Sequence, residues 1–149
     1  MNFHFRRATE KDAEAVRLLT HAAYSKWVPI IGREPLPMKA DYKLAITDHQ
    51  IDLLEINDRL VALIEMIPET EWLLIENLAV EPNFQCSGYA SALIKRAQDT
   101  AKELHLKGLR LFTNKMFKSN VDFYARRGFT VDYEEPFMGG TTVYMIKSL

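Results

Sequence analysis

The sequence has almost no cysteine, no long apolar segment and no excess of charge of one sign. Its only cysteine is Cys86, so no disulfide can form within the chain. The longest apolar run, from Leu60 to Ile64, has five residues, whereas a helix needs about 20 apolar residues to cross a bilayer. The opening MNFHFRRATEKD lacks the apolar stretch of a secretory signal. We therefore expect a cytoplasmic protein without a membrane span.

Positive and negative charges nearly cancel. The chain has 19 Lys and Arg residues against 20 Asp and Glu residues, a net charge of -1 with histidine neutral. Because a nucleic-acid-binding domain normally carries a strongly basic face, we do not expect nucleic acid as a partner. The histidines also lack the spacing of metal ligands, and one cysteine supplies no thiolate cluster, so we predict no metal site. These histidines are His4, His21, His49 and His105.

The first third of the chain contains signals for one strand and two helices. Alternating apolar residues predict a short strand at residues 3–7. Thr9 and Asp12 have the spacing of a capping box, which predicts the start of a helix. The apolar face of that helix is expected to comprise Val16, Leu19, Ala23 and Trp27. A proline-containing loop at 32–38 and a short helix around 39–47 are expected to follow.

The rest of the chain contains most of the expected strands. They lie at residues 51–56, 60–67, 72–80, 108–113, 130–133 and 141–146. After Pro82 the apolar period becomes helical, with a face formed by Leu93, Ala97, Ala101 and Leu104. A second capping box at 119–122 predicts another helix, which ends at Gly128. The order βααβββαβαββ predicts a single α+β domain, residues 1–149, around a central sheet.

Small residues stand where the strand that ends at Val80 gives way to the next helix. Gly88, with Ser87 and Ala90 beside it, allows backbone N–H groups to converge there without a large side chain in the way. The partial positive charge at the helix N-terminus suits a phosphate or diphosphate. The alternative is a tight turn that binds no ligand. The two common phosphate-loop patterns, GxxxxGK[ST] and GxGxxG, are absent.

Three motifs resemble the GCN5-related N-acetyltransferase (GNAT) family. Gln85-x-x-Gly88-x-Ala90, preceded by Leu78-Ala79-Val80-x-Pro82, resembles the family's coenzyme motif Q/R-x-x-G-x-G/A. Asn120-x-x-Phe123-Tyr124-x-x-x-Gly128-Phe129 resembles its later helix signature, and Arg7-Ala8-Thr9-x-x-Asp12 resembles the entry to its first helix. Together the matches span essentially the whole chain. The resemblance implies the GNAT fold, a mixed central sheet of about seven strands flanked by about four helices.

The resemblance also implies acetyl-CoA as the acyl donor. Backbone groups of Leu78 and Val80 would bind the pantetheine arm between splayed strands, and amides of the following turn would hold the diphosphate. The cofactor-binding residues expected on this basis are Leu78, Ala79, Val80, Gln85, Cys86, Ser87, Gly88, Tyr89, Ala90, Ser91, Asn120 and Tyr124. Cys86 and Ser87 occupy positions where the family often has basic residues or glycine, so less positive charge is expected beside the diphosphate.

Acyl transfer to an amine needs a base for the amine and a proton for the departing thiolate. The resemblance makes Tyr124 the candidate acid, because a phenol with a pKa of about 10 is protonated at neutral pH. The alternative is a packed ring whose hydroxyl meets a backbone carbonyl. Glu76 is the expected base and Glu65 the second choice, with solvated carboxylates as the alternative for both. We interpret Cys86 as a small turn residue rather than an acyl-enzyme nucleophile.

In the family that the chain resembles, the acceptor enters opposite the coenzyme, between the first two helices and the last hairpin. The acceptor-binding residues expected there are Tyr24, Trp27, Arg33, Glu34, Met38, Tyr42, Phe137 and Met138. The alternative is a partly exposed loop. The expected function is direct transfer of an acetyl group from acetyl-CoA to a primary amine of a small molecule or peptide. The other hypotheses are a non-catalytic acyl-CoA-binding regulatory domain and an interaction domain without a cofactor. The resemblance also allows a homodimer.

Overall fold

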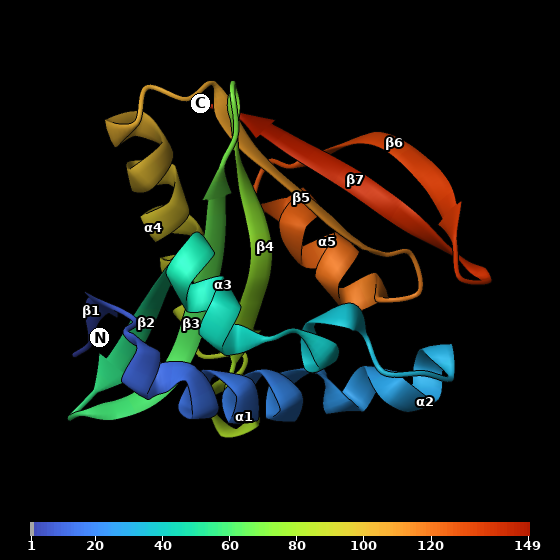
Figure 1. The fold of residues 1–149 in the computed structure, drawn as a ribbon. Coiled ribbons are helices and arrows are strands. Elements are labelled where there is room, and N and C mark those ends of the chain that lie inside the picture. The colour runs from blue at the N-terminus through green and yellow to red at the C-terminus, as the bar shows by residue number, and fades with distance from the viewer. Residues whose placement is uncertain (1) are drawn as a thin grey trace.

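Seven strands form one mixed sheet in the computed structural model, which describes residues 2–149 (Figure 1). The strands are β1 (His4–Arg7), β2 (Gln50–Ile56), β3 (Arg59–Pro68), β4 (Trp72–Val80), β5 (Gly108–Asn114), β6 (Thr130–Phe137) and β7 (Gly140–Ser148). Their order across the sheet is β1-β2-β3-β4-β5-β7-β6. Neighbouring strands are antiparallel except for β4 and β5. The predicted order of the strands along the chain is confirmed, but β6 runs past its predicted end because an edge strand tolerates Pro136.

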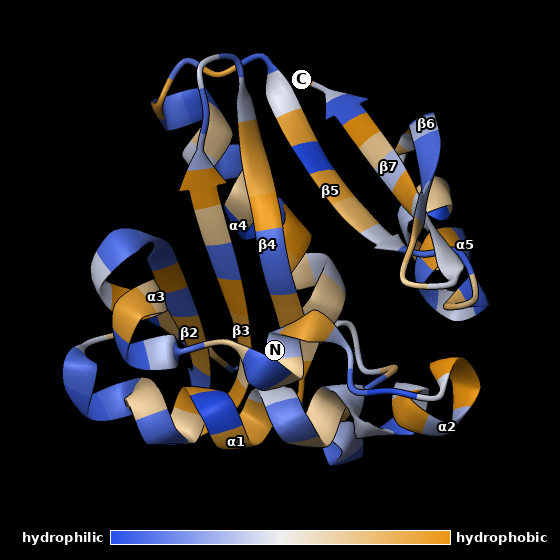
Figure 2. Ribbon diagram, turned by 45° about the vertical axis from the view of Figure 1, so that its right-hand side comes forward, coloured by the Kyte–Doolittle hydropathy of each residue, from blue (hydrophilic) through white to orange (hydrophobic). Residues whose placement is uncertain are grey.

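Helices cover both faces of the sheet. They are α1 (Ala13–Tyr24), α2 (Val28–Ile31), α3 (Tyr42–Asp48), α4 (Tyr89–Glu103) and α5 (Lys118–Arg126). Apolar side chains of α1 and α3 pack on one face of the sheet, and those of α4 and α5 pack on the other. Figure 2 shows this arrangement and the hydrophobic colour along most of β3 and β4. No helix within residues 2–149 is both long enough and apolar enough to span a membrane.

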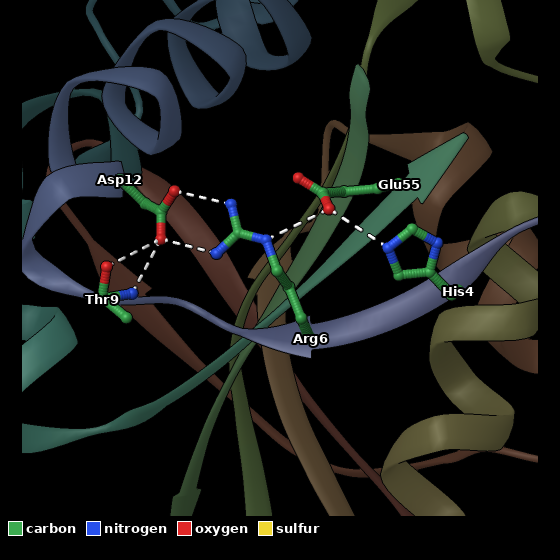
Figure 3. Close-up of polar contacts among 5 residues, drawn as sticks. All are labelled: His4, Arg6, Thr9, Asp12 and Glu55. Atoms are coloured by element: carbon green, nitrogen blue, oxygen red, sulfur yellow. Dashed lines mark hydrogen bonds and ion pairs between the residues drawn. The ribbon is translucent and has the colours of Figure 1, made fainter. Parts of the chain in front are cut away.

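The predicted capping box at Thr9 and Asp12 is confirmed and belongs to a larger polar cluster (Figure 3). The Asp12 carboxylate accepts the Thr9 backbone N–H at 2.8 Å. The Arg6 guanidinium donates to both oxygens of Asp12 at 2.9 and 2.8 Å and to Glu55 at 3.1 Å. The hydrogen bonds from Arg6 lower the pKa of Asp12 to about 2. On the other side, His4 Nε2 lies 3.3 Å from Glu55. The cluster ties β1 to β2 and to the start of α1.

Two predictions about the first helices were wrong in detail. Trp27 does not belong to the apolar face of α1, because α1 ends at Tyr24. Trp27 lies in the 3-10 turn that follows, and its ring stacks on that of Phe117 with the centroids 4.3 Å apart. The expected loop contains a 3-10 turn, Leu36–Lys39, so α3 begins only after it. Asp41 caps α3 by accepting a backbone N–H at 3.2 Å.

Two predictions in the second half were also wrong. Leu104 is 47% exposed, because α4 ends one residue before it and the chain then turns to pack Leu106 on the core. The capping box predicted at 119–122 is not formed. The backbone N–H of Phe117 donates to the carbonyl of Asn114 at 2.9 Å, and this turn starts α5 before Ser119 is reached.

Candidate active site

Strands β4 and β5 pair only along their first halves. Trp72 to Ile75 lie in parallel register with Gly108 to Leu111, and the pairing stops there. From Glu76 to Val80 the backbone of β4 therefore has no strand partner on the side of β5. Figure 2 shows the two strands spreading apart. A cavity of about 500 Å³ opens beside the unpaired part of β4.

A β-bulge at Glu76 marks the point where the strands separate. Across the ladder from β3, Met66 pairs with Ile75 and Glu65 with Asn77, so Glu76 is one extra residue in β4. A bulge bends a strand and reverses the facing of the residues that follow. Accordingly, Ile75 packs toward α4, whereas Asn77 lies on the opposite face, where its side chain bonds to Thr20 and Tyr42. The bulge brings the Glu76 carboxylate to the cavity.

Most of the predicted cofactor residues line this cavity. Those that do are Leu78, Val80, Gln85, Cys86, Gly88, Ala90, Ser91, Asn120 and Tyr124. Three others lie elsewhere: Ala79 is buried on the α1 face, Ser87 is exposed, and the ring of Tyr89 packs against Phe3 and Phe84. The strand end, the turn before α4 and the start of α5 thus meet around one space.

The turn before α4 needs left-handed backbone at two positions. Gly88 has φ +89° and Cys86 has φ +62°. This left-handed conformation is unfavourable for any residue other than glycine. The Gln85 side chain donates to the Val80 carbonyl at 3.0 Å and accepts from Lys26 Nζ at 3.1 Å. Gln85 therefore ties the turn to the end of β4 and to the segment after α1. This leaves the backbone N–H groups at the start of α4 to face a ligand.

Tyr124 presents its hydroxyl to the cavity. Its ring packs between Phe123 and Phe129, with centroids 5.3 and 5.5 Å away. Within residues 2–149 its hydroxyl has no hydrogen-bond partner, so the bond to a backbone carbonyl that we considered is not formed. Burial raises the pKa of Tyr124 to about 12, which keeps the phenol protonated. Nearby, the Tyr24 hydroxyl donates to the Leu78 carbonyl at 3.5 Å.

The two candidate bases have different surroundings. Glu76 is half-buried at the cavity and forms no ion pair with any residue of the described chain. Burial, followed by the nearby charge of Glu65, raises the pKa of Glu76. Glu65 is buried away from the cavity lining and lies 2.6 Å from Nδ1 of His49. Geometry therefore favours Glu76 as the carboxylate that meets a ligand.

Only half of the predicted acceptor residues reach the cavity. Tyr24, Trp27, Arg33 and Phe137 line it, whereas Glu34, Met38, Tyr42 and Met138 do not. Met38 and Tyr42 are buried in the core, where the Tyr42 hydroxyl donates to the Pro37 carbonyl at 2.6 Å, and Met138 is 60% exposed. The lining also includes Phe112, which the sequence did not single out.

Comparison with known proteins identifies the family. Residues 14–129 match the model of the acetyltransferase (GNAT) family. The chain belongs to this family. A search of curated proteins found no match.

Solved structures show the same fold. PaiA N-acetyltransferase from Thermoplasma acidophilum, in complex with coenzyme A, superposes with a TM-score of 0.84 at 18% identity, over 100% of both chains. A GNAT family acetyltransferase from Elizabethkingia anophelis with acetyl-CoA bound superposes with a TM-score of 0.71 at 18% identity, over 99% of both chains. The ribosomal-protein-S18-alanine N-acetyltransferase from Escherichia coli superposes with a TM-score of 0.78 at 15% identity, over 98% of this chain and 93% of that one. The predicted GNAT fold is confirmed.

Arg127 is a charged residue at the site of this GNAT enzyme that sequence reasoning missed. Arg127 lines the cavity and donates two N–H groups to the hydroxyl of Ser91, 36 residues earlier, at 3.0 and 2.8 Å. It brings a positive charge to the turn in which Cys86 and Ser87 are neutral. The motif gave no signal for it, because its position before Gly128 is a variable one in the helix signature.

Proposed function

We propose that this GNAT enzyme transfers an acetyl group from acetyl-CoA directly to a primary amine of a small molecule or peptide. The cavity beside the unpaired half of β4 is the observation that carries the proposal. Around it lie the free β4 backbone, the turn at Gly88 and the unbonded hydroxyl of Tyr124. Two structural relatives hold coenzyme A or acetyl-CoA, which supports acetyl-CoA as the donor.

The residues present fit an acyl-CoA. The unpaired backbone of β4 offers N–H and C=O groups to the amides of a pantetheine arm, as an added strand would. The turn at Gly88, at the N-terminus of a 15-residue helix, offers backbone N–H groups and the helix dipole to a diphosphate. When bound, acetyl-CoA supplies an acyl group activated as a thioester and a thiol leaving group.

Glu76 and Tyr124 hold and move the two protons. The Glu76 carboxylate accepts the proton that the amine loses as its nitrogen bonds to the acyl carbon, and its raised pKa makes it a stronger base than an ordinary carboxylate. Tyr124 donates its phenolic proton to the sulfur as the C–S bond breaks. We assign polarisation of the acyl oxygen to a backbone N–H near Leu78, on the strand that the bulge frees.

The acceptor amine enters past Tyr24, Trp27, Arg33 and Phe137. The three aromatic rings give the entrance an apolar wall, and the Arg33 guanidinium lies over the Phe137 ring, 5.8 Å from its centroid. Beyond this wall the only side chain that we assign to the amine itself is the unpaired carboxylate of Glu76, which also attracts a protonated amine from water.

Two measurements on the purified protein test the proposal. The first is acetyl-CoA binding by calorimetry, and the second is release of free coenzyme thiol in the presence of a panel of primary amines. Binding together with amine-dependent release supports the proposal. Binding with no release across the panel would favour the non-catalytic acyl-CoA-binding domain. No binding would overturn both.

A further inference from the structure

Arg127 is held rigidly beside the turn that precedes α4. It follows the last residue of α5, and its guanidinium lies over the ring of Phe123 with its central carbon 3.6 Å from the centroid. Its Nη1 donates to the Phe123 carbonyl at 3.1 Å, while Nε and Nη2 donate to the Ser91 hydroxyl at 3.0 and 2.8 Å. Contacts on two helices therefore fix both the position and the plane of the guanidinium.

These contacts leave part of the guanidinium unused. A guanidinium carries five N–H donors, and Ser91 and Phe123 take three, which leaves two. No carboxylate within residues 2–149 forms an ion pair with Arg127, although nine of the other 18 arginine and lysine side chains pair with Asp or Glu. Because the Ser91 oxygen accepts from Arg127, its own O–H is free to donate outward. Both residues line the cavity.

A merely structural role would be to fasten α5 to α4. A neutral donor would do that equally well, so fastening the helices does not require a full positive charge beside a cavity. The charge does matter for a phosphate group, because Arg donates charge-assisted, paired hydrogen bonds to phosphate oxygens. The adjoining turn carries no cation of its own, since residues 86 to 91 are Cys-Ser-Gly-Tyr-Ala-Ser.

We propose that Arg127, oriented by Ser91 and Phe123, binds the diphosphate of the coenzyme and supplies the positive charge that Cys86 and Ser87 lack. This inference rests on the proposed function, because it assumes that the ligand is an acyl-CoA. It assigns Arg127 as a binding residue, with Ser91 as a residue that positions it.

Calorimetric affinities of Arg127→Gln, Arg127→Lys and Ser91→Ala test this assignment. The probes are coenzyme A, dephospho-coenzyme A, which keeps the diphosphate but loses the 3′-phosphate, and pantetheine, which has no phosphate. Arg127→Gln should weaken coenzyme A and dephospho-coenzyme A equally, by roughly 10- to 100-fold, because a charge-assisted contact is lost. Pantetheine binding should not change. Arg127→Lys should recover part of the loss, and Ser91→Ala should cost roughly 3- to 10-fold.

Lys95→Gln is the matched control. It removes one positive charge from the exposed side of the same helix α4, where Lys95 pairs with Asp99, and should leave all three affinities unchanged. Wild-type affinity for coenzyme A in Arg127→Gln would overturn the inference, as would a loss confined to coenzyme A, which would place Arg127 at the 3′-phosphate. If Arg127→Gln fails to fold, unchanged affinity in both Arg127→Lys and Ser91→Ala would overturn it. Failure of the wild-type protein to bind coenzyme A would instead overturn the proposed function.

Discussion

The carboxylate of Glu65 lies 2.6 Å from Nδ1 of His49, on the face of the sheet that α1 and α3 cover. On the adjacent strand, Glu76 forms no ion pair with any of residues 2–149 and lies at the cavity. The bulge produces this difference, because one extra residue in β4 changes which side chains face which side. The first and second choices of base from the sequence therefore have different surroundings in the structure.

Replacement of Glu76 should separate catalysis from stability. Glu76→Gln should lower kcat by about 100-fold, the ordinary contribution of a general base. It should also remove the part of the acidic limb of the pH-rate profile that belongs to this carboxyl. The folded state raises the pKa of Glu76, so the charged carboxylate present at high pH lowers the free energy of unfolding. Glu76→Gln should therefore unfold at a higher temperature than the wild type at neutral pH.

The control for Glu76 is Glu65→Gln, measured for kcat over the same pH range. Since Glu65 is held by His49 away from the cavity lining, its loss should affect kcat less than the loss of Glu76. A larger loss in Glu65→Gln would reverse the assignment of the base.

Removal of the Tyr124 hydroxyl should slow turnover while leaving coenzyme affinity nearly intact. Tyr124→Phe should lower kcat by about 100-fold, because the proton for the thiolate must then come from water. Burial raises the pKa of Tyr124 to about 12, so ionisation of this phenol should not reduce the wild-type rate below about pH 10. The measurements are kcat and the affinity for acetyl-CoA.

Tyr144→Phe provides a matched control for Tyr124. The Tyr144 hydroxyl donates to Glu135 at 2.7 Å and is not part of the cavity lining. Its removal should leave kcat unchanged. Equal rates in Tyr124→Phe and the wild type, with an acceptor that the enzyme uses well, would remove Tyr124 as the acid.

Cys86 should be replaceable by glycine without loss of activity. At φ +62° a side chain costs about 1 kcal/mol, which glycine avoids, whereas a β-branched residue makes the strain worse. Cys86→Gly should keep wild-type thiol release and be at least as stable. Cys86→Val should lower the melting temperature and weaken acetyl-CoA binding. Loss of turnover in Cys86→Gly, with binding retained, would point instead to a thiol that takes part in the chemistry.

The cluster in Figure 3 should make the fold sensitive to acid. The pKa of Asp12 falls from an ordinary 3.8 to about 2, so its contribution is present above pH 3.8 and is lost as the pH falls through about 2. Asp12→Asn should lower the free energy of unfolding by about 1 to 3 kcal/mol at neutral pH, and the difference should vanish near pH 2. Urea unfolding at several pH values measures this. Glu14→Gln, in the exposed pair with Arg17, should cause no measurable change at either pH. A constant difference across the pH range would contradict the account.

Sequence patterns were sufficient for elements whose signals are local. The strand alternation, the box at Thr9 and the turn at Gly88 each lie within a few residues, and the structure has all three. The bulge at Glu76 depends on register with β3, and Arg127 depends on Ser91, 36 residues earlier. Such pairings are set by the folded sheet and helices, so no window of sequence contains them.

The same limit explains the acceptor side. An aromatic loop residue reaches either the cavity or the core depending on how its turn is closed. Trp27 lies at the cavity because a 3-10 turn follows α1, whereas Tyr42 is buried because it opens α3 under the cap of Asp41. Both are aromatic residues of the same region, and their sequence contexts do not distinguish them.

We expect a coenzyme diphosphate to lie against the turn at Gly88, beside the unpaired half of β4. Calorimetric titration of coenzyme A into the wild type and into Gly88→Val tests it most directly, with circular dichroism to establish that both proteins are folded. Coenzyme A should bind the wild type, with a gain of about 2.7 kcal/mol in stability at 100 times the dissociation constant, and should not bind folded Gly88→Val. Binding that survives in Gly88→Val, or no binding to the wild type, would contradict this placement of the diphosphate.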